Sequence, residues 1–186
     1  MKLDSKYKTC LKNGDELIIR SAVKSDAKDI LEYLKKISSE SDNLPYGEGE
    51  LDIDIEEEEE YIVDIENDSN CIILLGIVNN EIACLGNIIN ESRERLMHNA
   101  EVSISVKMKY QSLGIGSELL NKLIGFSKDT KIIKNISLGV KEDNYKAIRL
   151  YEKFNLKKTG RNKKFFNING VFFDQIIMAL EIHSQK

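Results

Sequence analysis

Residues that bind transition metals or form disulfide bonds are scarce in this chain. It has two histidines, His98 and His183, and three cysteines among its 186 residues. The histidines lie far apart in the sequence, and no Cys-x-x-Cys pair is present. Cys71 and Cys84 lie in apolar stretches, where reduced, buried thiols are typical. We therefore expect no metal site and no disulfide framework.

The chain also lacks a basic excess and any long apolar run. Its formal charge is −4 and its isoelectric point is near 5.4, whereas nucleic acids and anionic membranes bind proteins through a basic face. The apolar run at residues 71–78 is far too short to span a bilayer, and residues 1–8 have no apolar core of a signal peptide. We expect a cytoplasmic protein without a nucleic-acid or membrane partner.

Apolar periodicity predicts two helices in the first third of the chain. The first follows a strand near residues 17–19, and the second occupies about residues 55–66 after a loop that contains the only proline, Pro45. Asp54 is the expected N-cap of the second helix. The apolar residues at helical spacing are Ile30, Leu31, Leu34 and Ile37 in the first helix and Ile55, Ile62 and Ile65 in the second.

Two turns that contain asparagine predict β-hairpins. Asn79-Asn80 separates the apolar stretches at residues 71–78 and 82–89, and Asn169-Gly170 separates two aromatic-rich stretches. Asn and Gly tolerate the positive φ angles that two-residue hairpin turns require. Between the hairpins, residues 101–106 alternate polar and apolar side chains, so one face of this strand should be polar and form a wall of a site.

A glycine-containing turn connects that strand to an amphipathic helix. Residues 106–117 include Gly114 and Gly116, which remove side chains from the start of the helix. Backbone N–H groups and the positive end of the helix dipole can therefore hold an anion there. A P-loop would need Lys-Ser/Thr after Gly116, and a dinucleotide fold would need Gly-x-Gly-x-x-Gly; neither is present. A further strand near residues 136–140 should run parallel to the strand before the turn.

The pattern Gln111-x-x-Gly114-x-Gly116 resembles the pyrophosphate loop of the GNAT N-acetyltransferases, which receives acyl-coenzyme A. The resemblance includes the strand at residues 98–106 and a helix at 144–154, which is similar to the second coenzyme A helix of the family. With Val171–Ile182 as the last strand, it covers roughly residues 16–182. Members often have proline at Met108, glycine at Ser112 and Gly-Phe at residues 155–156. These departures remove no catalytic group, although a serine at 112 would alter the loop if that position needs positive φ.

The resemblance implies acetyl-CoA as cosubstrate and a set of residues that hold it. Two catalytic roles follow: Tyr151 as proton donor to the departing thiolate, and Glu101 as the base for the amine, with ordered water as the alternative base. The amide near Val106 is the expected donor to the carbonyl oxygen. The expected acetyl-CoA contacts are Val106, Gln111, Ser112, Leu113, Gly114, Ile115, Gly116, Ser117, Asn144 and Tyr151.

The expected fold is α/β, of the α+β type. A length of 186 residues with 41% hydrophobic content suits one domain. We expect a mixed, mostly antiparallel sheet of about seven strands with helices on both faces. The domain should occupy residues 16–182 and follow an N-terminal extension at 1–15.

The acceptor amine is less well defined by the sequence. Nine acidic residues and no Lys or Arg lie between Glu48 and Glu60, where the acceptor-binding helices of the family lie. A cationic acceptor, small molecule or protein, is one interpretation, and a solvated helix face is the other. A catalytically silent acyl-CoA-binding or sensing domain is the alternative to the enzyme. The acyl-chain preference and the oligomeric state stay open, with a homodimer as one alternative.

Overall fold

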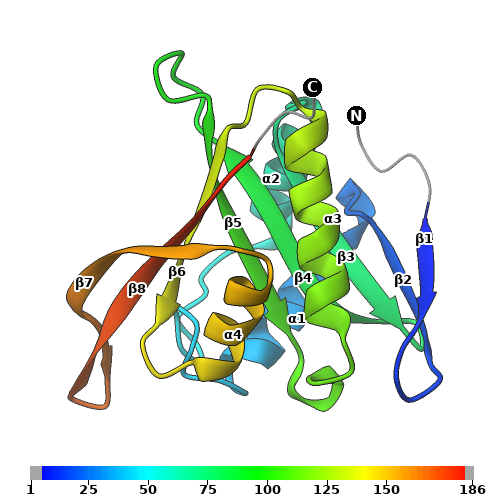
Figure 1. Ribbon diagram of the computed structural model, residues 1–186. Coiled ribbons are helices and arrows are strands. Elements are labelled where there is room, and N and C mark those ends of the chain that lie inside the picture. The colour runs from blue at the N-terminus through cyan, green and yellow to red at the C-terminus, as the bar shows by residue number, and fades with distance from the viewer. Residues whose placement is uncertain (1–5, 183–186) are drawn as a thin grey trace.

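A computed structural model describes residues 6–182, so His183 and the first part of the N-terminal extension lie outside the described residues. Eight strands, four α-helices and two short 3-10 helices make up this part of the chain (Figure 1). In chain order they are β1 Tyr7–Cys10, β2 Glu16–Ser21, η1 Lys24–Asp26, α1 Ala27–Ser38, α2 Ile55–Asn67, β3 Ile72–Val78, β4 Glu81–Asn90, β5 Asn99–Val106, η2 Met108–Tyr110, α3 Ile115–Asp129, β6 Asn135–Lys141, α4 Tyr145–Lys153, β7 Lys157–Ile168 and β8 Val171–Glu181.

All eight strands belong to one sheet with the order β1-β2-β3-β4-β5-β6-β8-β7. Every neighbouring pair is antiparallel except β5 and β6, which are parallel as expected for strands joined through a crossover helix. The predicted fold class is confirmed. The additional strand is β1, which pairs with β2 although it lies in the segment that the sequence assigned to an N-terminal extension.

Helices cover both faces of the sheet. On one face, α3 and α4 pack on a core to which α3 contributes Leu119, Leu120 and Leu123, all fully buried. On the other face, α1 and α2 pack on a smaller core that contains Tyr33 and Ile62. Figure 1 shows α3 in front of the sheet and α1 and α2 behind it. No helix in residues 6–182 is long and apolar enough to cross a membrane.

Local sequence signals set the ends of several elements. Asp54 caps α2 by accepting a hydrogen bond from the backbone N–H of Glu57 at 2.9 Å, and Glu57 bonds back in a capping box. The turn residues Asn79 and Asn80 both have positive φ, as the hairpin prediction requires. Of the apolar residues at helical spacing in α2, Ile62 is buried and Ile65 is half-buried, whereas Ile55 in the first turn is 46% exposed.

The parallel strands β5 and β6 separate soon after they begin to pair. Their register joins Asn99 to Asn135, Ala100 to Ile136 and Glu101 to Ser137, and no pair follows. The rest of β5 therefore has only one neighbouring strand, β4. The resulting opening lies at the carboxyl end of β5, where the loop to α3 begins (Figure 1).

Two glycines test how closely α3 packs on the sheet. A Cβ added at Gly86 of β4 would lie 2.9 to 3.0 Å from buried side chains of α3 and β5, whereas one added at Gly125 of α3 meets nothing within 4 Å. We expect Gly86→Ala to destabilise the protein by about 1–3 kcal/mol through overpacking. Gly125→Ala should stabilise it by about 0.5–1 kcal/mol through helix propensity. Urea unfolding measures both changes, and equal effects would contradict the tight packing of α3 at Gly86.

Candidate functional site

The loop between β5 and α3 has a left-handed backbone at two positions. Ser112 has φ 66° and Gly114, the N-cap of α3, has φ 100°. Gly114 adopts this left-handed conformation without cost, whereas a serine does so at a cost of about 1–2 kcal/mol. Position 112 therefore requires positive φ. Ser112 adopts this φ under strain, and the loop does not change its shape to avoid it.

Five consecutive backbone N–H groups in this loop have no hydrogen-bond acceptor within the described part of the chain. They belong to residues 112–116, and the first amide with a partner is that of Ser117, which donates to Gly114 O at 3.0 Å. Unpaired amides of this kind attract anions, and the positive end of the α3 dipole adds to that attraction. The loop therefore presents a row of free backbone donors at the start of α3, the arrangement that an anion cradle needs.

Carboxylates of two other elements hold the start of the loop. Glu40, just after α1, accepts a hydrogen bond from the Met108 N–H at 2.8 Å. Glu81 of β4 accepts a hydrogen bond from the Tyr110 hydroxyl and forms ion pairs with Lys107 and Lys109. These partners lower the pKa of Glu81 to about 2 against the opposing effect of burial. The sequence analysis missed both anchors, because neither glutamate lies near the loop in the chain.

The backbone of Val106 faces the opening between β5 and β6. The next residue, Lys107, donates its N–H to Ala83 O of β4 at 3.0 Å. Adjacent amides of a strand point to opposite sides, so the Val106 N–H points away from β4. The Val106 carbonyl points the same way and accepts a hydrogen bond from Gln111 Nε2 at 3.3 Å.

Helix α4 brings Tyr151 to the same region. A Cβ added at Gly116 would lie 3.1 Å from Leu150 Cδ2, so the start of α3 and the middle of α4 are in close contact. Tyr151 follows Leu150 and is only 6% exposed, and burial raises its pKa to about 12. Its hydroxyl has no hydrogen-bond partner among residues 6–182, so it is protonated at neutral pH and available as a donor.

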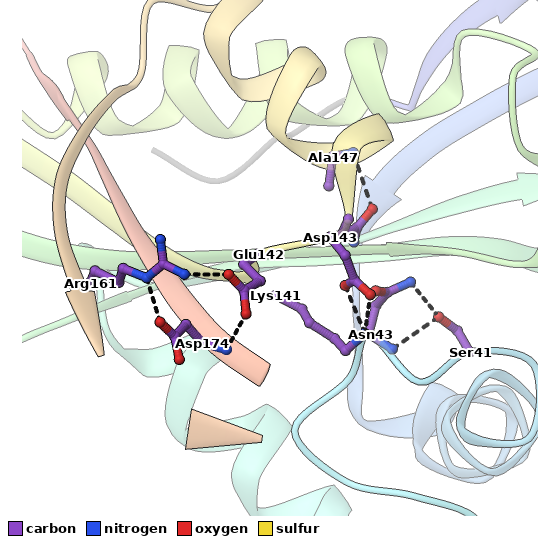
Figure 2. Close-up of polar contacts among 9 residues, drawn as sticks. Ser41, Asn43, Lys141, Glu142, Asp143, Ala147, Arg161 and Asp174 are labelled. Atoms are coloured by element: carbon purple, nitrogen blue, oxygen red, sulfur yellow. Dashed lines mark hydrogen bonds and ion pairs between the residues drawn. The ribbon is translucent and has the colours of Figure 1, made fainter. Parts of the chain in front are cut away.

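The turn from β6 into α4 is fixed by ion pairs (Figure 2). Lys141 is buried and donates to both carboxylate oxygens of Asp143 at 2.7 Å. Arg161 of β7 bridges Glu142 and Asp174. These contacts hold the segment that leads to Asn144.

Asn144 itself begins α4. Its side chain accepts a hydrogen bond from the Ala147 N–H at 3.3 Å, which confirms it as the N-cap of α4.

Glu101 lies apart from these groups. Its side chain is exposed on the polar face of β5 and has no hydrogen bond or ion pair within the described residues. Five residues separate it from Val106, or about 17 Å along a strand. A proton could pass from the Val106 region to Glu101 only through intervening water.

A cleft of about 790 Å³ lies on the other face of the sheet, between α1, α2 and the loop that joins them. Its floor includes Ser103 and Ser105 of β5, so it reaches the strand that ends at Val106. The Tyr33 hydroxyl and Ser105 Oγ are hydrogen-bonded at 2.9 Å beneath it. The acidic side chains that line the cleft come from α2 and the segment before it, and they are Asp52, Glu57, Glu58, Glu60 and Asp64.

Glu58 differs from the other acids of this wall. It is 6% exposed, whereas Asp52, Glu57, Glu60 and Asp64 are exposed to solvent. Burial raises the pKa of Glu58, and its charge contributes to the raised pKa values of Tyr46 and Tyr61, which line the same cleft. The acidic run is therefore part of a cleft wall and only partly a solvated helix face.

The charge on buried Glu58 should lower the stability of the free protein. A carboxyl group whose pKa is raised on folding destabilises the folded state progressively as pH rises above its ordinary, unfolded-state pKa. We expect Glu58→Gln to raise Tm at pH 7, by about 2–4 °C for each kcal/mol that the substitution adds to the free energy of unfolding. This gain in Tm should disappear as pH falls below the ordinary carboxyl pKa near 4.5. Differential scanning calorimetry across pH measures this.

The matched control is Glu56→Gln, on the same helix but exposed and outside the cleft lining. Its Tm should stay level or fall slightly, because an acid in the first turn favours the helix dipole. A lower Tm in Glu58→Gln than in the unchanged protein would contradict the burial cost.

Known acetyltransferases resemble this chain in sequence. Residues 31–156 match the Acetyltransferase (GNAT) family. The L-amino acid N-acetyltransferase AaaT of Escherichia coli is 29% identical over 105 residues, which cover 53% of this chain and 65% of that protein. An N-alpha-acetyltransferase of Sulfolobus acidocaldarius is 35% identical over 65 residues, covering 35% and 39%. The chain thus matches less than two thirds of the length of either relative.

Solved structures share the fold over almost the whole chain. A GNAT-family acetyltransferase of Streptococcus pneumoniae has a TM-score of 0.87 and 28% identity, covering 90% of this chain and 99% of that one. YncA of Salmonella typhimurium, solved with acetyl-CoA, has a TM-score of 0.79 and 18% identity, covering 91% and 95%. Together with the family match, these similarities show that the chain belongs to the GNAT acetyltransferase family.

Proposed function

We propose that this protein transfers an acetyl group from acetyl-CoA to a primary amine by direct attack in a ternary complex. The observation that carries the proposal is the placement of two sites at the end of β5. The unpaired amides of residues 112–116 lie at its carboxyl end, and the acidic cleft reaches Ser105. The acceptor cleft therefore reaches to within one residue of the end of β5 at Val106, and the anion cradle begins six residues after that end.

The residues present fit a coenzyme A pyrophosphate. The five unpaired amides supply donors, and Gly116 leaves room where a side chain would stand. We assign Val106, Gln111, residues 112–117, Asn144 and Tyr151 to this binding site. The thioester supplies an activated acetyl group, and this chain must orient the amine, stabilise the carbonyl oxygen and assist the departure of sulfur.

Each of these tasks has a candidate group. During transfer the amine nitrogen bonds to the acetyl carbon, the carbon–sulfur bond breaks and the amine loses a proton. The Val106 N–H points into the opening and can donate to the carbonyl oxygen as it becomes negative. The Tyr151 hydroxyl, protonated because its pKa is about 12, can donate to the sulfur as it leaves. Water accepts the proton of the amine and passes it through solvent to Glu101, which acts as the base.

The anion cradle predicts the effect of charge at Gly116. We expect Gly116→Asp to weaken acetyl-CoA binding at least tenfold, because a like-charge contact near a surface costs about 1–4 kcal/mol. Gly116→Ala is the matched control, since it adds only a Cβ against the flexible end of Leu150. It should weaken binding much less. Calorimetric titration with acetyl-CoA measures both, and unchanged affinity in the aspartate variant would remove the cradle assignment.

The role of Tyr151 predicts a loss of turnover without a loss of binding. We expect Tyr151→Phe to lower kcat about tenfold to a thousandfold, since only the unpartnered hydroxyl is removed. The affinity for acetyl-CoA and the Tm should change little. The measurement is release of free thiol from acetyl-CoA with a pool of primary amines, with mass spectrometry of the acetylated product.

The same assay tests the function as a whole. Acetyl-CoA-dependent product from the unchanged protein supports the acetyltransferase. Tight acetyl-CoA binding with no product from any amine would instead support a silent acyl-CoA sensor. Normal turnover of Tyr151→Phe would return Tyr151 to a packing role.

A further inference from the structure

The acceptor cleft combines apolar walls with negative charge. Among its apolar walls are Leu34, Leu44, Leu51 and Leu85, and two tyrosine rings, Tyr46 and Tyr61, also line it. Its acids lie on α2 and the segment before it, and no Lys or Arg of the described chain lines it. The cleft therefore suits an aliphatic body that ends in a positive charge.

Glu58 is the buried acid of this cleft, and the fold gives it no partner. Five polar or charged side chains of the described residues are buried, and the other four each have a hydrogen bond. Asp26 accepts two from Arg20, Lys141 donates to Asp143, and Ser38 and Ser127 donate to backbone carbonyls. The Glu58 side chain has neither a hydrogen bond nor an ion pair within residues 6–182.

An unpaired carboxylate is costly to bury, and the residues packed around Glu58 do not reduce that cost. Lys24 forms an ion pair with α2, but its partner there is Glu59, at 3.1 Å, and not Glu58. Tyr46 and Tyr61 line the same cleft as Glu58, and the pKa of each phenol is raised by burial and also by the charge of Glu58. An ammonium group can bind a carboxylate and aromatic rings at once, so a cationic ligand would satisfy all three groups.

We propose that Glu58 recognises a second cationic group of the acceptor, one that stays charged at neutral pH, so that the substrates are amines with an additional ammonium or guanidinium group on an aliphatic body. This inference rests on the proposed acetyltransferase function. Free amino acids fit less well, because their carboxylate would enter a cleft lined by acids and by no basic side chain.

The reacting amine is a poor partner for Glu58. An amine must lose its proton before it attacks, and a nearby carboxylate stabilises the protonated form. Pairing with Glu58 would therefore oppose the reaction at the amine that becomes acetylated. A second cationic group gains binding energy from the same carboxylate without that penalty. Glu58 is thus a specificity-determining residue and not the catalytic base.

The test compares acceptors that differ by one charge. Steady-state thiol release with 1,5-diaminopentane, pentylamine and L-alanine should give the unchanged protein its lowest KM for the diamine. Glu58→Gln should raise that KM about tenfold to a hundredfold, the usual effect of losing a charged hydrogen bond. The kcat, the KM for pentylamine and the KM for acetyl-CoA should change little.

Glu56→Gln is again the control, because it removes the same charge from an exposed position of α2 outside the cleft lining. It should leave the preference for the diamine unchanged. A similar rise in KM for both variants would show that the diamine responds to the general negative field, which overturns the role of Glu58. Equal KM values for diamine and pentylamine in the unchanged protein would also overturn it.

A binding measurement separates this inference from the proposed function. Calorimetric titration of 1,5-diaminopentane into the protein loaded with coenzyme A needs no turnover. Binding that depends on Glu58, together with no turnover of any amine, would reject the acetyltransferase and keep the recognition site. Turnover without diamine preference would keep the enzyme and reject the inference. Absence of both turnover and Glu58-dependent binding would reject both.

Discussion

The separation of β6 from β5 after three paired residues is the constraint on which the rest of the site depends. A parallel pair that continued past Glu101 and Ser137 would use the backbone groups of β5 in the sheet. Because β6 leaves, the Val106 N–H faces an opening rather than another strand. Helix α4 packs against the start of α3 through Leu150, the residue before Tyr151. The sheet thus gives up backbone hydrogen bonds at one place, and the groups released there are the ones the proposed chemistry needs.

Charge is distributed unequally on the two sides of β5. The loop to α3 presents unpaired N–H groups, while the cleft on the opposite face presents carboxylates. The loop is also held by two carboxylates, since Glu40 accepts from the Met108 N–H and Glu81 anchors Tyr110. An anionic coenzyme would therefore approach the side that presents N–H donors, and a cationic acceptor the side that presents carboxylates. A chain with a formal charge of −4 can contain an anion site because the donors of that site are backbone amides, which add no net charge.

The parts of this architecture that depend on local sequence could be predicted. Capping by Asp54 and Asn144, and the positive φ of Asn79 and Asn80, follow from interactions within a few residues. The parallel pairing of β5 and β6 follows from the handedness of the crossover. The anchors Glu40 and Glu81 could not be predicted, because their contacts join residues 68 and 29 positions apart in the chain. Strand β1 was missed because it is short and at the edge of the sheet.

The burial of Glu58 could not be predicted from the acidic run around it, and it is the most informative feature of the cleft. Five consecutive glutamates on a helix must point in several directions, and only the packing of α2 decides which one turns inward. Selection for stability alone would favour glutamine or an apolar residue at that position, because a buried charge without a partner costs free energy. A residue that lowers stability and lines a ligand-sized cleft is typical of a binding site, where stability is given up for function. The acidic run therefore has two parts with different physics: an exposed part that caps and solvates α2, and one largely buried carboxyl side chain that a bound cation would stabilise.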